Sequence, residues 1–382
     1  MNRPAIVLCC LTLLCVTVTT GAFKKPRFKP FRIEGLEEKP TFWQVRPEEV
    51  IAACKDVSRG QSEVIARTPL RYPVYAVFFG DFSDAPPQTN WSAGNSSSSR
   101  HAYLGESDRK EQTILFVAGV HGSEPENVAA AVNLIHLLDT GKDLLGREDK
   151  EFLTLAEHYR FIIVPCLNMD GRAISPDHFR GQPYEVFRAA SQGVWSDGSL
   201  VGWLGSKEWF PLPLAKVSYP GGYPNADGYN IQHDVAPGDM RTEEARALCR
   251  LAARWRVDFM LNGHSCEGLP FVAYPSRVES GEHQEWGRQL ARKANRAILD
   301  AGLRDREYGN ERPHDTLNLT NLLTWCSGGL GLTLETYHGC YNAQGSITPY
   351  TFEQMIEPAF VVLKTVMREG LTHPLAGSSY RQ

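Results

Sequence analysis

The stretch ILFVAGVHGSEPENVAAAV, residues 114–132, changes from one kind of secondary structure to another. Its first part is a short apolar run rich in β-branched residues, which is typical of a buried strand. From Glu126 onward, alanines and spaced valines and leucines indicate an amphipathic helix that ends near Gly141. His121 and Glu124 therefore lie in a loop between a strand and a helix, at the edge where open α/β sheets bind ligands.

Apolar strands alternate with helices along the rest of the chain. Strands are predicted for residues 74–80, 161–166, 257–264, 271–275 and 330–335, and helices for residues 242–255, 286–299 and 352–367. Between them, residues 171–228 form a long insertion rich in Gly, Pro and Trp. This alternation predicts an α/β fold with a mostly parallel, mixed central sheet, helices on both faces and one large domain.

The composition is that of a soluble globular protein except at the N-terminus. Of the 382 residues, 42% are hydrophobic and 22% are charged, and the formal net charge of −4 argues against nucleic acid as the main partner. Arg3 precedes an apolar run that ends in small residues at Ala22 and is short for a membrane span. We interpret residues 1–22 as a signal peptide, so that the mature protein would be secreted or periplasmic, without a stable membrane anchor. A buried first helix or a retained anchor is the alternative.

Six cysteines would remain in the mature chain after signal removal. An even number in an exported protein permits up to three disulfides, and the sequence leaves their pairing open. Cys166 follows an apolar run and is expected to be a small buried side chain rather than part of a crosslink.

Three predicted strands end in residues that could form a catalytic zinc site. His121 and Glu124 form an H-x-x-E pair, and His264 ends another strand. A catalytic zinc ion needs three such protein ligands and one open position. Glu335 ends a further strand, where an unpaired carboxylate is costly unless it has a function, so it is the candidate general base. Each residue alone would be explained by a structural role, such as a glutamate paired with an arginine, but together they favour catalysis.

The order of these motifs resembles the zinc metallocarboxypeptidase family of carboxypeptidases A and B. In part it also resembles the deacylases of the succinylglutamate desuccinylase and aspartoacylase kind. The motifs are HGSE, LNMDG, PNADGYNIQHD, NGHS and GLTLE, within residues 67–371. The resemblance implies a carboxypeptidase-like fold, one zinc ion per chain bound by His121, Glu124 and His264, and Glu335 as general base and acid. The predicted division of the chain is a signal peptide at 1–22, an N-terminal arm and lead-in helix at 23–66, a catalytic domain at 67–375 and a C-terminal tail at 376–382.

One motif departs from the family pattern Gly-x-Asp-Leu-Asn-Arg-Asn, whose Asn and Arg hold the terminal carboxylate of the substrate. Here Gln232 and His233 stand at those two positions, and Asn230 replaces the Asp that orients a zinc histidine. Arginine binds carboxylates through two parallel bonds that a histidine cannot make. If His233 contacts the carboxylate, substrate binding is expected to strengthen as the pH falls towards about 6.5.

Other residues are matched to the substrate pocket by the same resemblance. Asn168 lies in the turn that shapes the pocket in the family. Arg180 is the candidate for the arginine that stabilises the oxyanion, with Arg172 in reserve, and Tyr308 and Tyr337 are candidates for the pocket tyrosine.

The resulting prediction is an exported zinc-dependent hydrolase that cleaves a peptide or amide bond near the carboxyl end of its substrate. The partner would be a peptide or a small acyl-amide. An amidase or deacylase whose substrate lacks a free α-carboxylate is the first alternative, and the histidine at position 233 favours it. A catalytically silent binding protein on the same scaffold is the second, and the retention of Glu335 beside all three ligands argues against it.

Overall fold

The computed structural model describes most of the chain. The described residues are 24, 26–83, 111–236, 239–279, 281–307, 316–341 and 350–376. The predicted signal peptide, the predicted C-terminal tail beyond residue 376 and Tyr308 lie outside these ranges. No helix in them has both the length and the apolar character needed to cross a bilayer.

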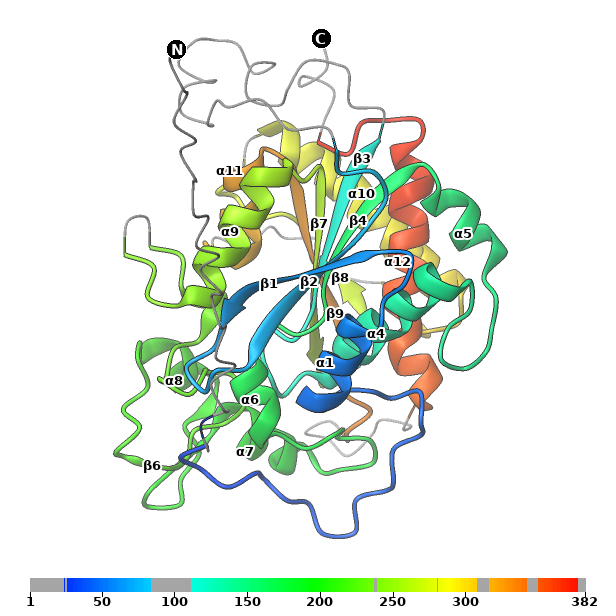
Figure 1. Cartoon of the computed structure of the whole chain (residues 1–382). Coiled ribbons are helices and arrows are strands. Elements are labelled where there is room, and N and C mark those ends of the chain that lie inside the picture. The colour runs from blue at the N-terminus through cyan, green and yellow to red at the C-terminus, as the bar shows by residue number, and fades with distance from the viewer. Residues whose placement is uncertain are drawn as a thin grey trace, which may run out of the picture.

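A mixed sheet of seven strands forms the centre of the molecule (Figure 1). Its strands lie in the order β1-β2-β4-β3-β7-β9-β8. Their bounds are β1 Gln61–Arg67, β2 Pro73–Phe79, β3 Gln112–Val117, β4 Tyr159–Val164, β7 Phe259–Cys266, β8 Phe271–Val272 and β9 Leu330–Tyr337. The pairs β4–β3, β3–β7 and β7–β9 are parallel, whereas the pairs that include β1, β2 or β8 are antiparallel. The predicted mostly parallel, mixed sheet is therefore confirmed.

Helices cover both faces of this sheet, as the sequence predicts. Along β3, Ile114 and Phe116 face one hydrophobic core, and Leu115 and Val117 face the other. In Figure 1, α4, α5 and α12 lie on one side of the sheet, and α9 and α11 lie on the other. The helices are α1 Pro47–Lys55, α4 Pro125–Thr140, α5 Lys150–Ala156, α6 Met169–Ile174, α7 Tyr184–Gln192, α8 Gly202–Glu208, α9 Glu243–Trp255, α10 Gly281–Asp300, α11 Leu319–Ser327 and α12 Phe352–Gly370.

The predicted helix after His121 is present as α4. Pro125 occupies its first turn, and Gly141 ends it in a left-handed conformation with a φ of 86°. Residues 171–228, for which the sequence indicated only a long insertion rich in Gly, Pro and Trp, contain α7, α8 and the greater part of α6. They also contain a two-stranded sheet, β5 (Val194–Trp195) with β6 (Val217–Tyr219). These elements are short, so their sequences carry little periodicity.

The edge strand β1 was not predicted, and it begins before the expected domain boundary at residue 67. Gln61, Ser62, Glu63 and Val64 are all exposed, so this part of the strand lacks the alternation of apolar and polar residues that identifies a half-buried strand. The main sheet therefore includes residues from the segment that was predicted to be a lead-in.

No disulfide links the six cysteines of the predicted mature chain, all of which the structure describes. Cys54, Cys166 and Cys340 are buried. Cys249 on α9 and Cys326 on α11 are joined by a side-chain hydrogen bond.

Candidate metal centre

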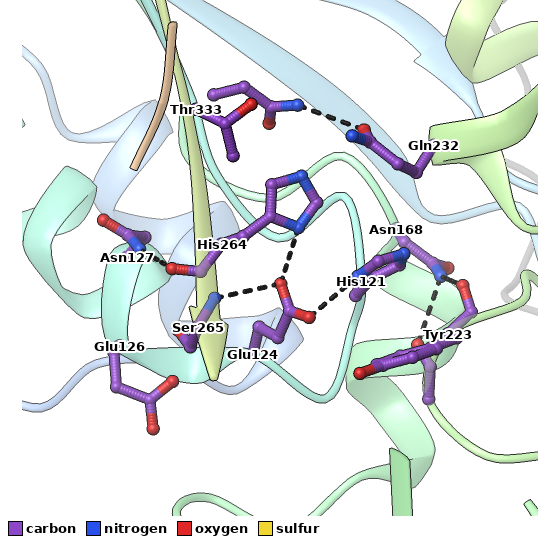
Figure 2. A network of polar contacts seen from close by, with 12 residues as sticks. His121, Glu124, Glu126, Asn127, Asn168, Tyr223, Gln232, His264, Ser265 and Thr333 are labelled. Atoms are coloured by element: carbon purple, nitrogen blue, oxygen red, sulfur yellow. Dashed lines mark hydrogen bonds and ion pairs between the residues drawn. The ribbon is translucent and has the colours of Figure 1, made fainter. Parts of the chain in front are cut away.

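His121, Glu124 and His264 meet at the carboxyl ends of β3 and β7 (Figure 2). The Glu124 carboxylate lies between the two rings, with Oε1 2.7 Å from Nδ1 of His121 and Oε2 2.8 Å from Nδ1 of His264. One possible ligand atom from each residue lies within 4.8 Å of the others, and all three side chains are buried. The structure thus brings together the three predicted zinc ligands.

Backbone contacts between α4 and β7 fix this arrangement. The Asn127 side chain on α4 donates a hydrogen bond of 2.7 Å to the carbonyl of His264. The backbone N–H of Ser265 donates to Oε2 of Glu124 at 3.3 Å. Gly263 permits this close approach, because a Cβ atom there would lie 2.7 Å from Cγ of Asn127. The glycine in the NGHS motif therefore has a packing role beside the histidine.

Asn230 determines which nitrogen of His121 is free to bind a metal. Oδ1 of Asn230 accepts a hydrogen bond from the backbone N–H of Gln232 at 3.2 Å, which identifies the oxygen end of the amide. The same oxygen lies 3.1 Å from Nε2 of His121, so it can accept a hydrogen bond from the tautomer that is protonated at Nε2. Nδ1 is then available as a ligand towards Glu124. Asn230 can therefore orient His121 although it replaces the aspartate of the family pattern.

The charges of the three residues match the donor set of a zinc ion. Burial opposes ionisation of Glu124, but His121 and His264 outweigh it and hold the pKa of the carboxyl well below its usual range. Burial lowers the pKa of His121, whereas the charge of Glu124 outweighs burial at His264 and raises the pKa of that imidazole. Two imidazole nitrogens and one carboxylate oxygen suit zinc. The residues present therefore fit the implied metal.

Glu335 lies next to His264 on the neighbouring parallel strand. The two residues are in register between β7 and β9, so their side chains extend from the same face of the sheet. Burial raises the pKa of Glu335 to about 7, although His264 opposes this shift. No arginine or other described residue makes a hydrogen bond or ion pair with its carboxylate. A structural glutamate paired with an arginine does not explain this position, and buried carboxyl groups with perturbed pKa values cluster at functional sites.

Asn168 and Gln232 form hydrogen bonds within the walls of the site. Asn168 is fully buried. Its Oδ1 accepts from the N–H of Gly171 at 2.9 Å, and its Nδ2 donates to the carbonyl of Tyr223 at 3.0 Å. Oε1 of Gln232 accepts from Asn262 at 3.1 Å. These bonds position both side chains, and their predicted role in substrate binding stays a prediction.

The two arginines proposed for the oxyanion are held elsewhere. Arg180 pairs with Glu37 and donates to the carbonyl of Tyr350 at 2.7 Å, so its guanidinium is already committed. Arg172 is buried and donates to the backbone carbonyls of Ser175 and Pro176. In the described part of the chain, neither arginine forms a hydrogen bond or ion pair with the three ligands or Glu335, so the oxyanion role stays a prediction.

The candidate pocket tyrosine Tyr337 points into the core. Its hydroxyl donates to the carbonyl of Gln354 at 2.7 Å, and its ring stacks on Tyr350. It is therefore part of the packing between β9 and α12 and offers no group to a substrate.

The expected titration of His233 near neutral pH is also wrong. Burial, together with the charges of His121, Lys207 and His264, lowers the pKa of His233 to about 3. The imidazole is consequently neutral at any working pH. It cannot replace the charge of an arginine, and lowering the pH from 8 to 6 will not strengthen carboxylate binding through it.

Three side chains of the insertion that the sequence did not single out lie beside the centre. The Tyr223 ring stacks on His121, with ring centroids 4.1 Å apart, as Figure 2 shows. Trp203 packs edge-on against Tyr223 at 6.0 Å. Nζ of Lys207 lies 3.6 Å from the centre of the Trp203 ring. Trp203 and Lys207 are on α8, and nothing in its sequence distinguishes it from a loop.

Comparison with known proteins supports the reading of the site as a metallopeptidase centre. A sequence model described as zinc carboxypeptidase matches residues 84–198, which include His121 and Glu124 but not His264 or Glu335. The chain is similar to the zinc carboxypeptidases. The predicted resemblance is thus confirmed. A search of curated protein sequences found no match.

Solved structures of metallocarboxypeptidases share the fold. A metallo-carboxypeptidase from Burkholderia cenocepacia is 16% identical with a TM-score of 0.52, over 85% of this chain and 68% of that chain. A metallo-carboxypeptidase from Pseudomonas aeruginosa, in complex with (2-guanidinoethylmercapto)succinic acid, is 13% identical with a TM-score of 0.51. The match covers 84% of this chain and 67% of that chain. Bovine thrombin-activatable fibrinolysis inhibitor, in complex with tick carboxypeptidase inhibitor, is 13% identical with a TM-score of 0.50. The match covers 87% of this chain and 99% of that chain. The carboxypeptidase-like fold is confirmed, and family and fold together support a zinc metallopeptidase.

Proposed function

We propose that this chain is an exported zinc-dependent hydrolase that removes the carboxyl-terminal residue from peptides. The observation that supports this most is the placement of Glu335 in register with His264, beside two imidazole Nδ1 atoms that converge on Glu124. One zinc ion per chain would be held by these three ligands. Glu335, the proposed general base, is therefore adjacent to the ligands. No other described residue forms a hydrogen bond or ion pair with its carboxylate.

The chain's own residues supply the proton transfers of such a reaction. A zinc ion held by the three ligands would polarise the scissile carbonyl and increase the acidity of the attacking water. Glu335 is ionised above its pKa of about 7 in the metal-free chain, and a neighbouring cation favours ionisation further. Its carboxylate accepts the proton of the water and returns it to the leaving nitrogen. Asn230 keeps the His121 ring oriented during the cycle.

A zinc amidase or deacylase is the second candidate, and the site gives it specific support. Gln232 is bonded to Asn262 and His233 is neutral at working pH, so the two positions that resemble the carboxylate-binding pair carry no charge. A substrate without a free α-carboxylate would not need that charge. The two candidates share the metal centre and Glu335 and differ in the group beyond the scissile amide.

Hydrolysis of a matched library separates the two candidates. The zinc-loaded protein is incubated with N-acetylated tetrapeptides as free acids and with the same peptides as carboxyl-terminal amides, and products are identified by mass spectrometry. We expect free acids to lose their last residue, and a chelator to stop the reaction. Cleavage of acids and amides at equal rates would favour the amidase. Absence of cleavage in both series, with zinc bound, would contradict the hydrolase proposal.

Export is a proposal that rests on the N-terminal sequence. Arg3 and the apolar run that ends at Ala22 are typical of a cleaved signal peptide. Protein isolated from its natural host should begin near Phe23 on N-terminal sequencing. A mature protein that still begins at Met1 would contradict this proposal and leave the metal site unaffected.

A further inference from the structure

A lysine without an acidic partner lies beside the candidate metal centre. Lys207 on α8 is half-buried, and in the described part of the chain no carboxylate is within ion-pair distance of its ammonium. Glu335 is the acidic group whose charge acts on it. The charge of Lys207 also acts on His233. Lys207 is therefore close enough to Glu335 and to His233 for their charges to interact.

A row of aromatic rings connects Lys207 to the metal ligands. Its ammonium lies over the ring of Trp203, an arrangement in which a cation is attracted to the face of the indole. Trp203 packs edge-on against Tyr223, and Tyr223 stacks on His121. Contacts among the rings of Trp203, Tyr223 and His121 thus restrict the position of the Lys207 ammonium.

Trp203, and not a carboxylate, holds the ammonium group of Lys207. Cation–π attraction holds an ammonium without neutralising its charge, so Lys207 keeps its capacity to bind an anion. Burial lowers the pKa of Lys207, and the nearby Glu335 charge counteracts this. A half-buried ammonium interacts with an added carboxylate more strongly than an exposed one does, because water screens it less.

The residue that stands at the arginine position of the family pattern supplies no charge at neutral pH. His233 is neutral, and Arg172 and Arg180 donate to groups elsewhere in the chain. Lys207 comes from a different part of the sequence, within the insertion, yet its charge reaches both Glu335 and His233.

We propose that Lys207 is the specificity-determining residue that binds the free carboxylate at the end of the substrate, with Trp203 positioning its ammonium. The inference rests on the proposed function, and it narrows the substrate class to peptides or acylated amino acids whose free carboxylate follows the scissile amide. A lysine offers one point charge where an arginine offers a planar fork. Binding of the substrate carboxylate should therefore depend on a positive charge at position 207 and should be retained when arginine replaces Lys207.

Affinity selection from a mixed library tests this assignment. Zinc-loaded protein carrying Glu335→Gln, which prevents turnover, is equilibrated with N-acetylated dipeptides as free acids and as amides, and the bound fraction is measured by mass spectrometry. Lys207→Met should reduce the preference for acids over amides by about tenfold or more, because charge-assisted hydrogen bonds are the strong ones. Lys207→Arg should retain most of the preference. Lys216→Met, at an exposed lysine of the same insertion, should leave it unchanged.

Zinc content and thermal unfolding of each variant show whether it is folded. A folded Lys207→Met protein that keeps zinc and the full preference for acids would overturn the proposal. So would a protein with Glu335 intact that hydrolyses amides as fast as acids, although zinc-dependent amide hydrolysis, the second candidate function, would then stand. A parent that binds no zinc and cleaves nothing would instead contradict the proposed function itself.

Discussion

Replacing Glu335 with glutamine should lower kcat/KM by about 10²–10⁴-fold while the zinc content stays at one ion per chain. The amide of glutamine has nearly the same shape as the carboxylate but cannot accept the proton of the attacking water. In the part of the chain that the structure describes, Glu335 makes no hydrogen bond or ion pair with the three ligands, so its loss should not release the metal. Steady-state kinetics and metal analysis on the same preparation provide the measurement.

Glu267→Gln is the matched control for this prediction. Glu267 is a second glutamate whose charge acts on Glu335, and its carboxylate is 3.4 Å from the hydroxyl of Tyr184. It has no place in the proton transfers, so its replacement should change kcat/KM only slightly. If Glu335→Gln lost the zinc, or if the two variants lost activity equally, Glu335 would not be the general base.

Replacing His264 with alanine should reduce zinc affinity by at least about 100-fold, since even the loss of groups that only orient the ligands costs about 10–100-fold. The same change removes one of the two imidazoles that hold Glu124 in its ionised form. Because zinc binding to the folded state raises stability by mass action, the wild type should unfold at a higher temperature when zinc is added. The variant should lose that response.

His136→Ala is a suitable comparison for the histidine prediction. His136 lies on α4 near its exposed end and bonds to Thr140 and to the carbonyl of Lys142, well separated in sequence from the ligands. This variant should bind zinc as the wild type does. An unchanged zinc affinity in His264→Ala, measured by competition with a chelator, would show that the metal binds elsewhere.

The sequence identified the residues at strand ends well, for a physical reason. His121, His264 and Glu335 each follow an apolar run long enough to identify a buried strand, and parallel strands bring their carboxyl ends to one edge. The register that places Glu335 beside His264 then follows from the pairing of β7 with β9. Functional residues at the ends of strands could therefore be predicted from the hydrophobic pattern and the residue type.

Residues carried by the insertion could not be read in the same way. On α8, Trp203 is 46% exposed and Leu204 is 77% exposed, so the helix shows no apolar face from which its position could be predicted. Arg180 was chosen because its position in the sequence is close to that of the oxyanion arginine in the family. Its partners Glu37 and Tyr350 come from distant segments and could not be predicted from that position. His233 was expected to titrate because its burial beside other positive groups was not visible in the sequence.

The central claim is that His121, Glu124 and His264 hold a zinc ion beside Glu335. A crystal structure of the zinc-loaded protein, with anomalous diffraction recorded on both sides of the zinc absorption edge, tests it most directly. We expect one strong anomalous peak per chain, bonded to Nδ1 of His121, Nδ1 of His264 and the carboxylate of Glu124. A peak bonded to other residues, or no peak between these three side chains at full zinc occupancy in solution, would contradict it.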